Sequence, residues 1–234
     1  MVWPRQPLIA LASRFNRVEN LLIRMTVDSV LVVGATGTQG GAVVDHLLAG
    51  EAGDVDVHAM TRHAGGDEAI LLESRGVRVV EGDLTHKNKI RPLVEAVDGV
   101  FLVTTPFEQG VETEVEQGVN MAEVAAEVGV DHLVFSSVGG AERETGIPHF
   151  DSKYRIEERI DELDLPATVV RPVYFTTNFE GQRQAILNGQ LALALEEGVP
   201  LQLVAPDDVG AFVARAFADP DRYVGQAYEL AGDE

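Results

Sequence analysis

The chain has 234 residues, of which 45% are hydrophobic, and this size suits one large domain with a single core better than two domains. Thirty-eight acidic residues against eighteen basic ones give a formal net charge of −20, which repels phosphate backbones and argues against direct binding of nucleic acid. The sequence contains no cysteine, which excludes disulfides and thiolate chemistry, and no HxxxH or HExxH pair indicates a metal site.

The acidity has two possible explanations, a cationic partner or a solvated surface adapted to high salt. The acidic residues are spread along the whole chain, and lysine occurs only at Lys87, Lys89 and Lys153. Because salt screens the repulsion between like charges, this composition favours a halophile-like protein over one with a single cationic partner.

Residues 1–25 form a basic, partly apolar start that differs from the acidic remainder. We predict that they are an extension, either disordered or arising from a misassigned start, and that Met25 opens the domain. The apolar stretch is too short for a signal peptide, and no apolar run approaches the ~20 residues that a membrane span needs. We therefore expect a cytoplasmic protein that does not bind a membrane.

From Met25 onward, hydrophobic patterning predicts strands that alternate with helices. Strands are expected at Ser29–Val33, Val55–Met60, Val77–Val80, Val100–Thr104, His132–Ser136 and Ala167–Arg171. Helices are expected at Gln39–Ala49, Glu68–Arg75, Ile90–Val97, about 112–128 and Ser152–Leu163. This succession of βαβ units predicts an α/β fold with a doubly wound parallel sheet and helices on both faces.

The pattern is less regular after about residue 174. A helix is expected at Phe179–Asn188, an extended segment at Leu201–Val204, a helix capped by aspartate at Asp207–Ala218, and a last strand at Ala227–Leu230. We expect residues 26–234 to form a single domain, with a small C-terminal lobe beginning near residue 174.

A glycine-rich segment joins the first predicted strand directly to the first predicted helix. Gly34 would permit the tight turn, Gly37 would let the backbone approach a pyrophosphate, and Gly40 would allow close packing of helix against strand. A helix N-terminus at this point offers unpaired N–H groups to phosphates, and the threonine hydroxyls add donors. The segment predicts a dinucleotide phosphate site formed by Gly34, Thr36, Gly37, Thr38, Gln39 and Gly40.

The end of the second predicted strand indicates which dinucleotide is bound. NAD-specific sites place an acidic residue here, whereas this strand ends in Thr61 and Arg62. The guanidinium of Arg62 can bind a 2′-phosphate through two hydrogen bonds, and Thr61 can donate to it, so NADP(H) is favoured over NAD(H).

Two further strand ends supply candidate cofactor residues. Asp83 and Leu84 follow the third predicted strand, where the Asp83 carboxylate would either hold an adenine amino group or cap a helix. Thr104 and Thr105 end the fourth strand at the carboxyl edge of the sheet, where open α/β sheets bind ligands.

Taken together, these segments resemble the NmrA-like family, an atypical branch of the short-chain dehydrogenase/reductase superfamily. The resemblance rests on VGATGTQGG at 33–41, MTR at 60–62, EGDL at 81–84, VFSS at 134–137, HFDSK at 149–153, VRP at 170–172, NF at 178–179 and VAPDDVGA at 204–211. It implies a Rossmann fold, an NAD(P) site and a small C-terminal substrate region. Because family members continue beyond the point where this chain stops, it also implies that this region is truncated.

The resemblance also raises the question of catalysis. Many dehydrogenases of the superfamily use Tyr-x-x-x-Lys on one helix with a supporting serine. Here Lys153 is present, but His149 occupies the position of the tyrosine, and Ser136 and Ser137 stand where the supporting serine would be. The expected catalytic residues are Lys153, on the nicotinamide ribose, and His149, which can supply a proton near neutral pH.

Two functions from different classes remain open. The first is an oxidoreductase that transfers hydride from NADPH to a small quinone- or enone-type acceptor, because this reaction need not depend on an enzyme tyrosine. The second is a non-catalytic NAD(P) redox sensor that acts through a regulatory protein partner. A sugar-nucleotide epimerase is a weaker third candidate, since its chemistry depends on the missing tyrosine.

Overall fold

A computed structural model describes residues 27–143, 145–196 and 198–232. The predictions about residues 1–25 and the start at Met25 therefore lie outside the described residues.

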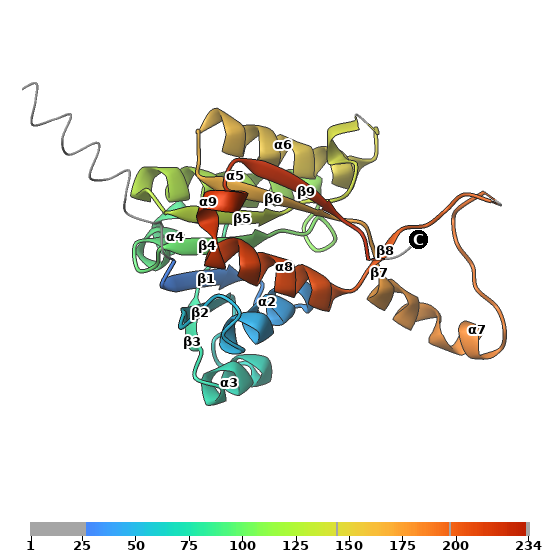
Figure 1. The fold of residues 1–234 in the computed structure, drawn as a ribbon, viewed down its shortest axis with the longest axis horizontal. Helices are drawn as coiled ribbons and strands as arrows, with labels where there is room; N and C mark the ends of the chain where they lie inside the picture. The colour runs from blue at the N-terminus through green and yellow to red at the C-terminus, as the bar shows by residue number, and fades with distance from the viewer. Residues whose placement is uncertain (1–26, 144, 197, 233–234) are drawn as a thin grey trace, which may run out of the picture.

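The centre of the molecule is a seven-stranded parallel sheet. Its strands are β1 (Ser29–Val33), β2 (Asp56–Thr61), β3 (Arg78–Glu81), β4 (Gly99–Val103), β5 (His132–Ser136), β6 (Ala167–Pro172) and β9 (Gln226–Leu230). They lie in the order β3-β2-β1-β4-β5-β6-β9, and every neighbouring pair is parallel (Figure 1). The chain winds outward in both directions from β1, so the predicted doubly wound Rossmann sheet is confirmed.

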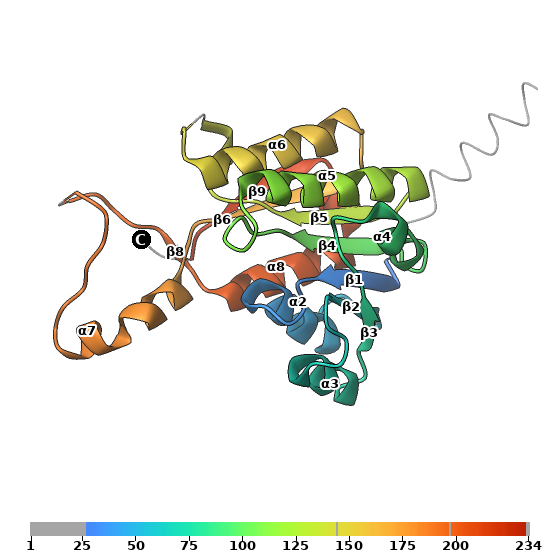
Figure 2. The same ribbon diagram turned by 180° about the vertical axis from the view of Figure 1, so that it is seen from behind.

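Helices cover both faces of this sheet, as Figures 1 and 2 show from opposite sides. One face carries α2 (Thr38–Leu48), α3 (Asp67–Ser74), α8 (Pro206–Ala218) and the short α9 (Pro220–Tyr223), and the other carries α4 (Lys87–Val94), α5 (Val111–Val128) and α6 (Pro148–Glu162).

The two cores follow from alternation along the strands. In β1, Val30 and Val32 pack toward α2 and α8, whereas Leu31 and Val33 pack toward α4 and α5. All four side chains are buried, and burying a valine or leucine side chain contributes about 1.5–3 kcal/mol. A strand that is buried on both faces has to be apolar throughout, which explains its continuous hydrophobic run.

Helices α2 and α8 pack closely against each other. A Cβ on Gly210 would lie 2.6 Å from the backbone oxygen of Ala42, so glycine lets the two helices approach. The predicted aspartate cap of α8 is wrong, because Ala205 is the N-cap and no described side chain caps the helix. Asp207 lies in the first turn and contacts the imidazole of His46 at 3.0 Å, which links α8 to α2.

Residues 174–196 and 198–204 form an arm that extends away from the body (Figure 1). It contains β7 (Tyr174–Phe175), the 3₁₀ helix η3 (Thr176–Gln182), α7 (Arg183–Leu187) and β8 (Leu203–Val204), and β7 pairs in parallel with β8. The helix predicted at Phe179–Asn188 is α-helical only in its second half. Leu187 is 70% exposed, so this segment lacks the packing that normally stabilises helices.

Among the described residues, none of the helices is both long enough and apolar enough to cross a membrane.

Candidate functional site

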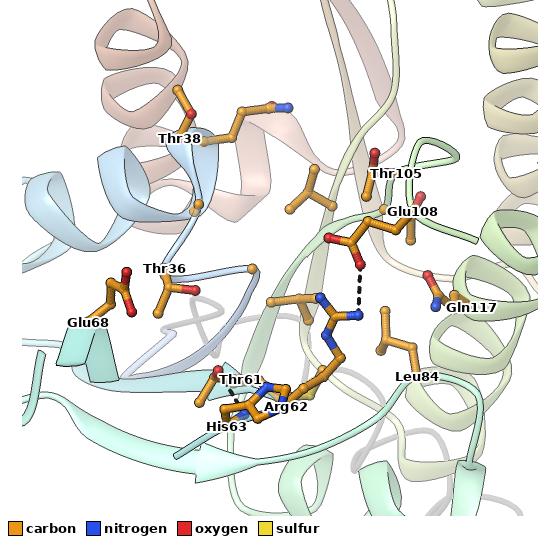
Figure 3. Close-up of a pocket in the computed structure, with 18 of the residues that line it drawn as sticks. Thr36, Thr38, Thr61, Arg62, His63, Glu68, Leu84, Thr105, Glu108 and Gln117 are labelled. Carbon is orange, nitrogen blue, oxygen red and sulfur yellow. Dashed lines mark hydrogen bonds and ion pairs between the residues drawn. The ribbon is translucent and has the colours of Figure 1, made fainter. Parts of the chain in front are cut away.

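A cavity of about 680 Å³ opens at the carboxyl ends of β1, β2, β3 and β4, where the sheet changes winding direction (Figure 3). This is the place at which open α/β sheets bind ligands. The structure brings twelve of the predicted cofactor residues together in its lining: Gly34, Thr36, Gly37, Thr38, Gln39, Gly40, Thr61, Arg62, Asp83, Leu84, Thr104 and Thr105.

The glycine-rich loop owes its shape to two close approaches. Gly34 has a positive φ of +67°, which favours glycine, and its carbonyl oxygen accepts a hydrogen bond from the Gly37 N–H at 2.8 Å. A Cβ on Gly40 would lie 2.2 Å from that same oxygen. Gly40 therefore lets the first turn of α2 pack directly against the loop backbone. The sequence predicted close packing against the strand, but the nearest atoms belong to Gly34 and Ala35 of the loop.

The N-terminus of α2 faces this cavity. Gly37 is its N-cap, no side chain in the described region caps it, and its first turn contains no acidic residue. The first N–H groups of a helix have no partner within the helix, and the macrodipole places partial positive charge there. Gln39 in this turn accepts a hydrogen bond from the Ser136 hydroxyl at 2.6 Å, which ties the helix to the end of β5.

Arg62 at the end of β2 is paired across the cavity. Its guanidinium lies 2.7 Å from the carboxylate of Glu108, and about half of each side chain is exposed (Figure 3). Thr61 accepts a hydrogen bond from the His63 N–H at 3.2 Å. Glu108 lies on the loop between β4 and α5, so nothing in the local sequence around Arg62 could have revealed it.

Asp83 holds a turn. Its Oδ1 atom accepts hydrogen bonds from the Thr85 hydroxyl at 2.7 Å and the Thr85 N–H at 3.0 Å, and these bonds hold the pKa of its carboxyl below its ordinary value. The N-cap of α4 is His86, so Asp83 stabilises the turn before the helix and is not the helix cap that the sequence allowed. Leu84 lines the cavity beside Gln117 of α5, a residue that sequence reasoning missed.

The two predicted catalytic residues lie on one helix but outside the cavity lining. Helix α6 begins at Pro148, one turn earlier than predicted, because proline suits the first position of a helix. His149 and Lys153 are therefore four residues apart on one face. The His149 ring packs against Phe150, with centroids 4.8 Å apart, and against the exposed Phe107 at 6.0 Å.

Lys153 lies beneath the cavity wall. Its side chain is 9% exposed, and its ammonium donates to the carbonyl oxygens of Thr104 at 2.7 Å and Ser136 at 3.2 Å. These carbonyls belong to the ends of β4 and β5, so Lys153 ties the two strand ends together.

A buried carboxylate balances this ammonium. Glu114 is fully buried in the first turn of α5, 3.2 Å from the Lys153 ammonium, and it accepts a hydrogen bond from the Ser152 hydroxyl at 2.5 Å. Burial lowers the pKa of Lys153, and the charge of Glu114 opposes that shift. In a chain this acidic, one more glutamate gives no sequence signal, and the prediction missed it.

Ser137, the second candidate supporting serine, points elsewhere. Its hydroxyl donates to Glu157, which also binds Arg171 at 2.5 Å. Within the described part of the chain, no group of three or more histidine, aspartate or glutamate residues is placed to hold a metal ion.

The sequence matches a known protein family and a characterised reductase. The model of the NmrA-like family matches residues 26–234. A (4-alkanoyl-5-oxo-2,5-dihydrofuran-3-yl)methyl phosphate reductase of Streptomyces griseus is 31% identical, with 88% of this chain and 68% of the reductase aligned.

Solved structures agree on the fold. The triphenylmethane reductase of a Citrobacter species, solved with NADP(H), has a TM-score of 0.77 and 24% identity over 88% of this chain and 70% of its own. NmrA, a negative transcriptional regulator solved with NADP, has a TM-score of 0.73 and 21% identity over 88% of this chain and 67% of its own. With a family model that matches nearly the whole described chain, this protein belongs to the NmrA-like family.

Proposed function

We propose that this protein binds NADP(H) in the cavity at the carboxyl ends of β1–β4, and that it is an oxidoreductase that reduces a small quinone- or enone-type acceptor. The observation that carries the proposal is the convergence of the glycine-rich loop, the uncapped α2 N-terminus and Arg62 on one cavity of about 680 Å³. A cavity of this size falls in the range that small ligands and cofactors occupy.

The lining residues fit the parts of the dinucleotide. The N–H groups of Thr38 and Gln39 at the start of α2 would hold the pyrophosphate, since no described acidic side chain competes for them in that turn. Arg62 and Thr61 would bind the 2′-phosphate. Thr104, at the end of β4, would lie toward the nicotinamide.

The acceptor class follows from the proton chemistry that the chain offers. NADPH, when bound, supplies the hydride. A tyrosine general acid is missing at position 149, so an acceptor whose reduction does not depend on such a donor suits the site best. The name of the Streptomyces reductase describes a ring with a carbonyl conjugated to a carbon–carbon double bond, which is an enone-type acceptor.

One observation favours the second function, a redox sensor. His149 and Lys153 do not belong to the cavity lining, and the ammonium of Lys153 is engaged by backbone carbonyls and Glu114. Such a site would bind the dinucleotide without a proton donor at hand, and the similarity to the regulator NmrA agrees with this alternative.

Turnover separates the two functions. The protein is first saturated with NADPH, and the fluorescence of the nicotinamide reports this binding. A panel of quinones and butenolide-type enones is then added while the absorbance of NADPH is recorded. Oxidation of NADPH that requires both protein and acceptor supports the oxidoreductase. Saturable binding with no oxidation by any acceptor would contradict it and support the sensor.

A further inference from the structure

The cavity carries an unusual balance of charge for a site that binds a phosphorylated cofactor. Among the described residues that line it, Arg62 is the one arginine or lysine, while Glu68, Asp83 and Glu108 contribute three carboxylates. The guanidinium of Arg62 lies 2.7 Å from the carboxylate of Glu108. The group best suited to bind a 2′-phosphate therefore already has an anionic partner.

The loop between β4 and α5 fixes the position of Glu108. Thr105, near the start of this loop, lines the cavity. The loop ends at Gly110, whose positive φ of +87° favours glycine. The Gly110 N–H donates to the Pro106 carbonyl oxygen at 2.8 Å and closes the turn. Glu108 therefore reaches Arg62 from the opposite wall of the cavity, as the dashed line in Figure 3 shows.

This ion pair is exchangeable. The Arg62 and Glu108 side chains are 52% and 54% exposed, and pairs this exposed are only weakly stabilising. A phosphate carries a charge of about −1.5 to −2 near pH 7 and offers more acceptor oxygens than a carboxylate. It can therefore take the guanidinium from Glu108, but the carboxylate remains close and repels it.

From these contacts we propose that Glu108 is a specificity-determining residue of the dinucleotide site. Its carboxylate competes with the 2′-phosphate of NADP(H) for Arg62, and it can accept a hydrogen bond from the ribose hydroxyl that NAD(H) presents instead. The preference between the two cofactors is therefore set by Arg62 and Glu108 together. This inference rests on the proposed function, because it concerns the same cavity.

The test is the affinity of Glu108→Gln for NADPH and NADH, measured by calorimetry beside the wild-type protein. Removal of the competing charge should tighten NADPH binding by about fivefold, the effect expected for one exposed ion pair, and should not tighten NADH binding. Glu116→Gln is the matched control: it removes the same charge from an exposed position of α5 outside the cavity lining, so it should leave both affinities unchanged.

An Arg62→Ala background shows whether the effect passes through the guanidinium. Glu108→Gln should tighten NADPH binding less in that background, because there is no guanidinium to release and only the repulsion between carboxylate and phosphate is relieved. If wild-type protein binds NADPH but Glu108→Gln leaves its affinity unchanged or weakens it, this inference is wrong and the proposed cofactor site stands. If wild-type protein binds neither dinucleotide, both are wrong.

Discussion

The ammonium nitrogen of Lys153 lies 2.7 Å from the carbonyl oxygen of Thr104 and 3.1 Å from its hydroxyl oxygen, and Thr104 is one of the residues that line the cavity. Lys153 therefore acts on the cavity through the strand end that it holds. Its predicted contact with a nicotinamide ribose stays a prediction. The buried pair that Lys153 makes with Glu114 has consequences for stability that can be measured without any ligand.

Lys153→Met should lower the free energy of unfolding by about 3 kcal/mol, because it leaves the buried Glu114 carboxylate without its cation. The double variant Lys153→Met/Glu114→Gln should lose less, since the uncompensated charge is then gone. Urea unfolding curves measure both values. A single variant within about 0.5 kcal/mol of the wild type would show that the pair is not stabilising, because surface changes fall in that range.

Gly40→Ala should destabilise the fold by about 2 kcal/mol or more, because the new Cβ would lie 2.2 Å from the Gly34 carbonyl oxygen and force the loop apart. Gly41→Ala is the matched control in the next position of α2. Its Cβ would meet its nearest neighbour at an ordinary 3.6 Å, and alanine favours a helix, so this variant should be as stable as the wild type or more so. Equal losses in thermal unfolding of the two variants would contradict this account of Gly40.

Arg62→Ala should weaken NADPH binding by about tenfold or more and NADH binding much less, because only NADPH carries the phosphate that Arg62 would bind. Arg78→Ala is the control, since Arg78 is an exposed residue of β3 that does not line the cavity. Calorimetric titration of both variants with both dinucleotides gives the comparison. Equal losses of NADPH and NADH affinity in Arg62→Ala would remove its assignment to the 2′-phosphate.

His132 should make the fold sensitive to acid. Burial lowers its pKa from 6.5 to about 4, and its Nδ1 atom has no partner among the described residues. Because the unfolded chain binds this proton more readily, the neutral imidazole stabilises the fold fully above pH 6.5. That stability is lost as the pH falls toward 4, by roughly 3 kcal/mol.

His132→Leu removes this titration, so its stability should fall less than that of the wild type between pH 7 and pH 4.5. Thr168→Val is the control, since it removes the 2.8 Å contact to the His132 imidazole and keeps the histidine. Urea unfolding at the two pH values measures each difference. Parallel losses in wild type and His132→Leu would show that another group dominates.

Salt should stabilise this protein. Its formal net charge of −20 means that carboxylates repel one another in the folded chain, and dissolved ions screen that repulsion. We expect the midpoint of thermal unfolding to rise with the concentration of KCl. At 1 M salt the screening length is already only ~3 Å, so 2 M KCl screens most of the repulsion. A midpoint that does not change between low salt and 2 M KCl would contradict the halophile-like interpretation of the composition.

The features that were predictable from the sequence are those with local causes. The hydrophobic run of β1 and the glycine spacing after it depend on neighbouring residues alone, and they fixed the position of the loop correctly. Alternation of strands and helices likewise predicted the parallel sheet. Once that sheet forms, its carboxyl edge brings Gly34, Arg62 and Thr104 to one cavity, because parallel strands end at the same edge.

The features that were missed have causes far away in the chain. Asp207 was predicted as a cap, but it contacts His46, and Ala205 caps α8. Glu108 is distant from Arg62 in the sequence, and the two meet because the β4–α5 loop and the end of β2 line the same cavity. Glu114 is buried because α5 packs against α6, where it contacts Lys153 and Ser152. The hydrophobic periodicity of a single segment does not reveal a contact between two helices.

Calorimetric titration of the wild-type protein with NADPH and NADH, in KCl concentrated enough to screen its charge, decides whether the cavity is a dinucleotide site. We expect saturable binding of NADPH at one site per chain, tighter than the binding of NADH. Failure of both dinucleotides to bind the folded protein would contradict the assignment of the cavity.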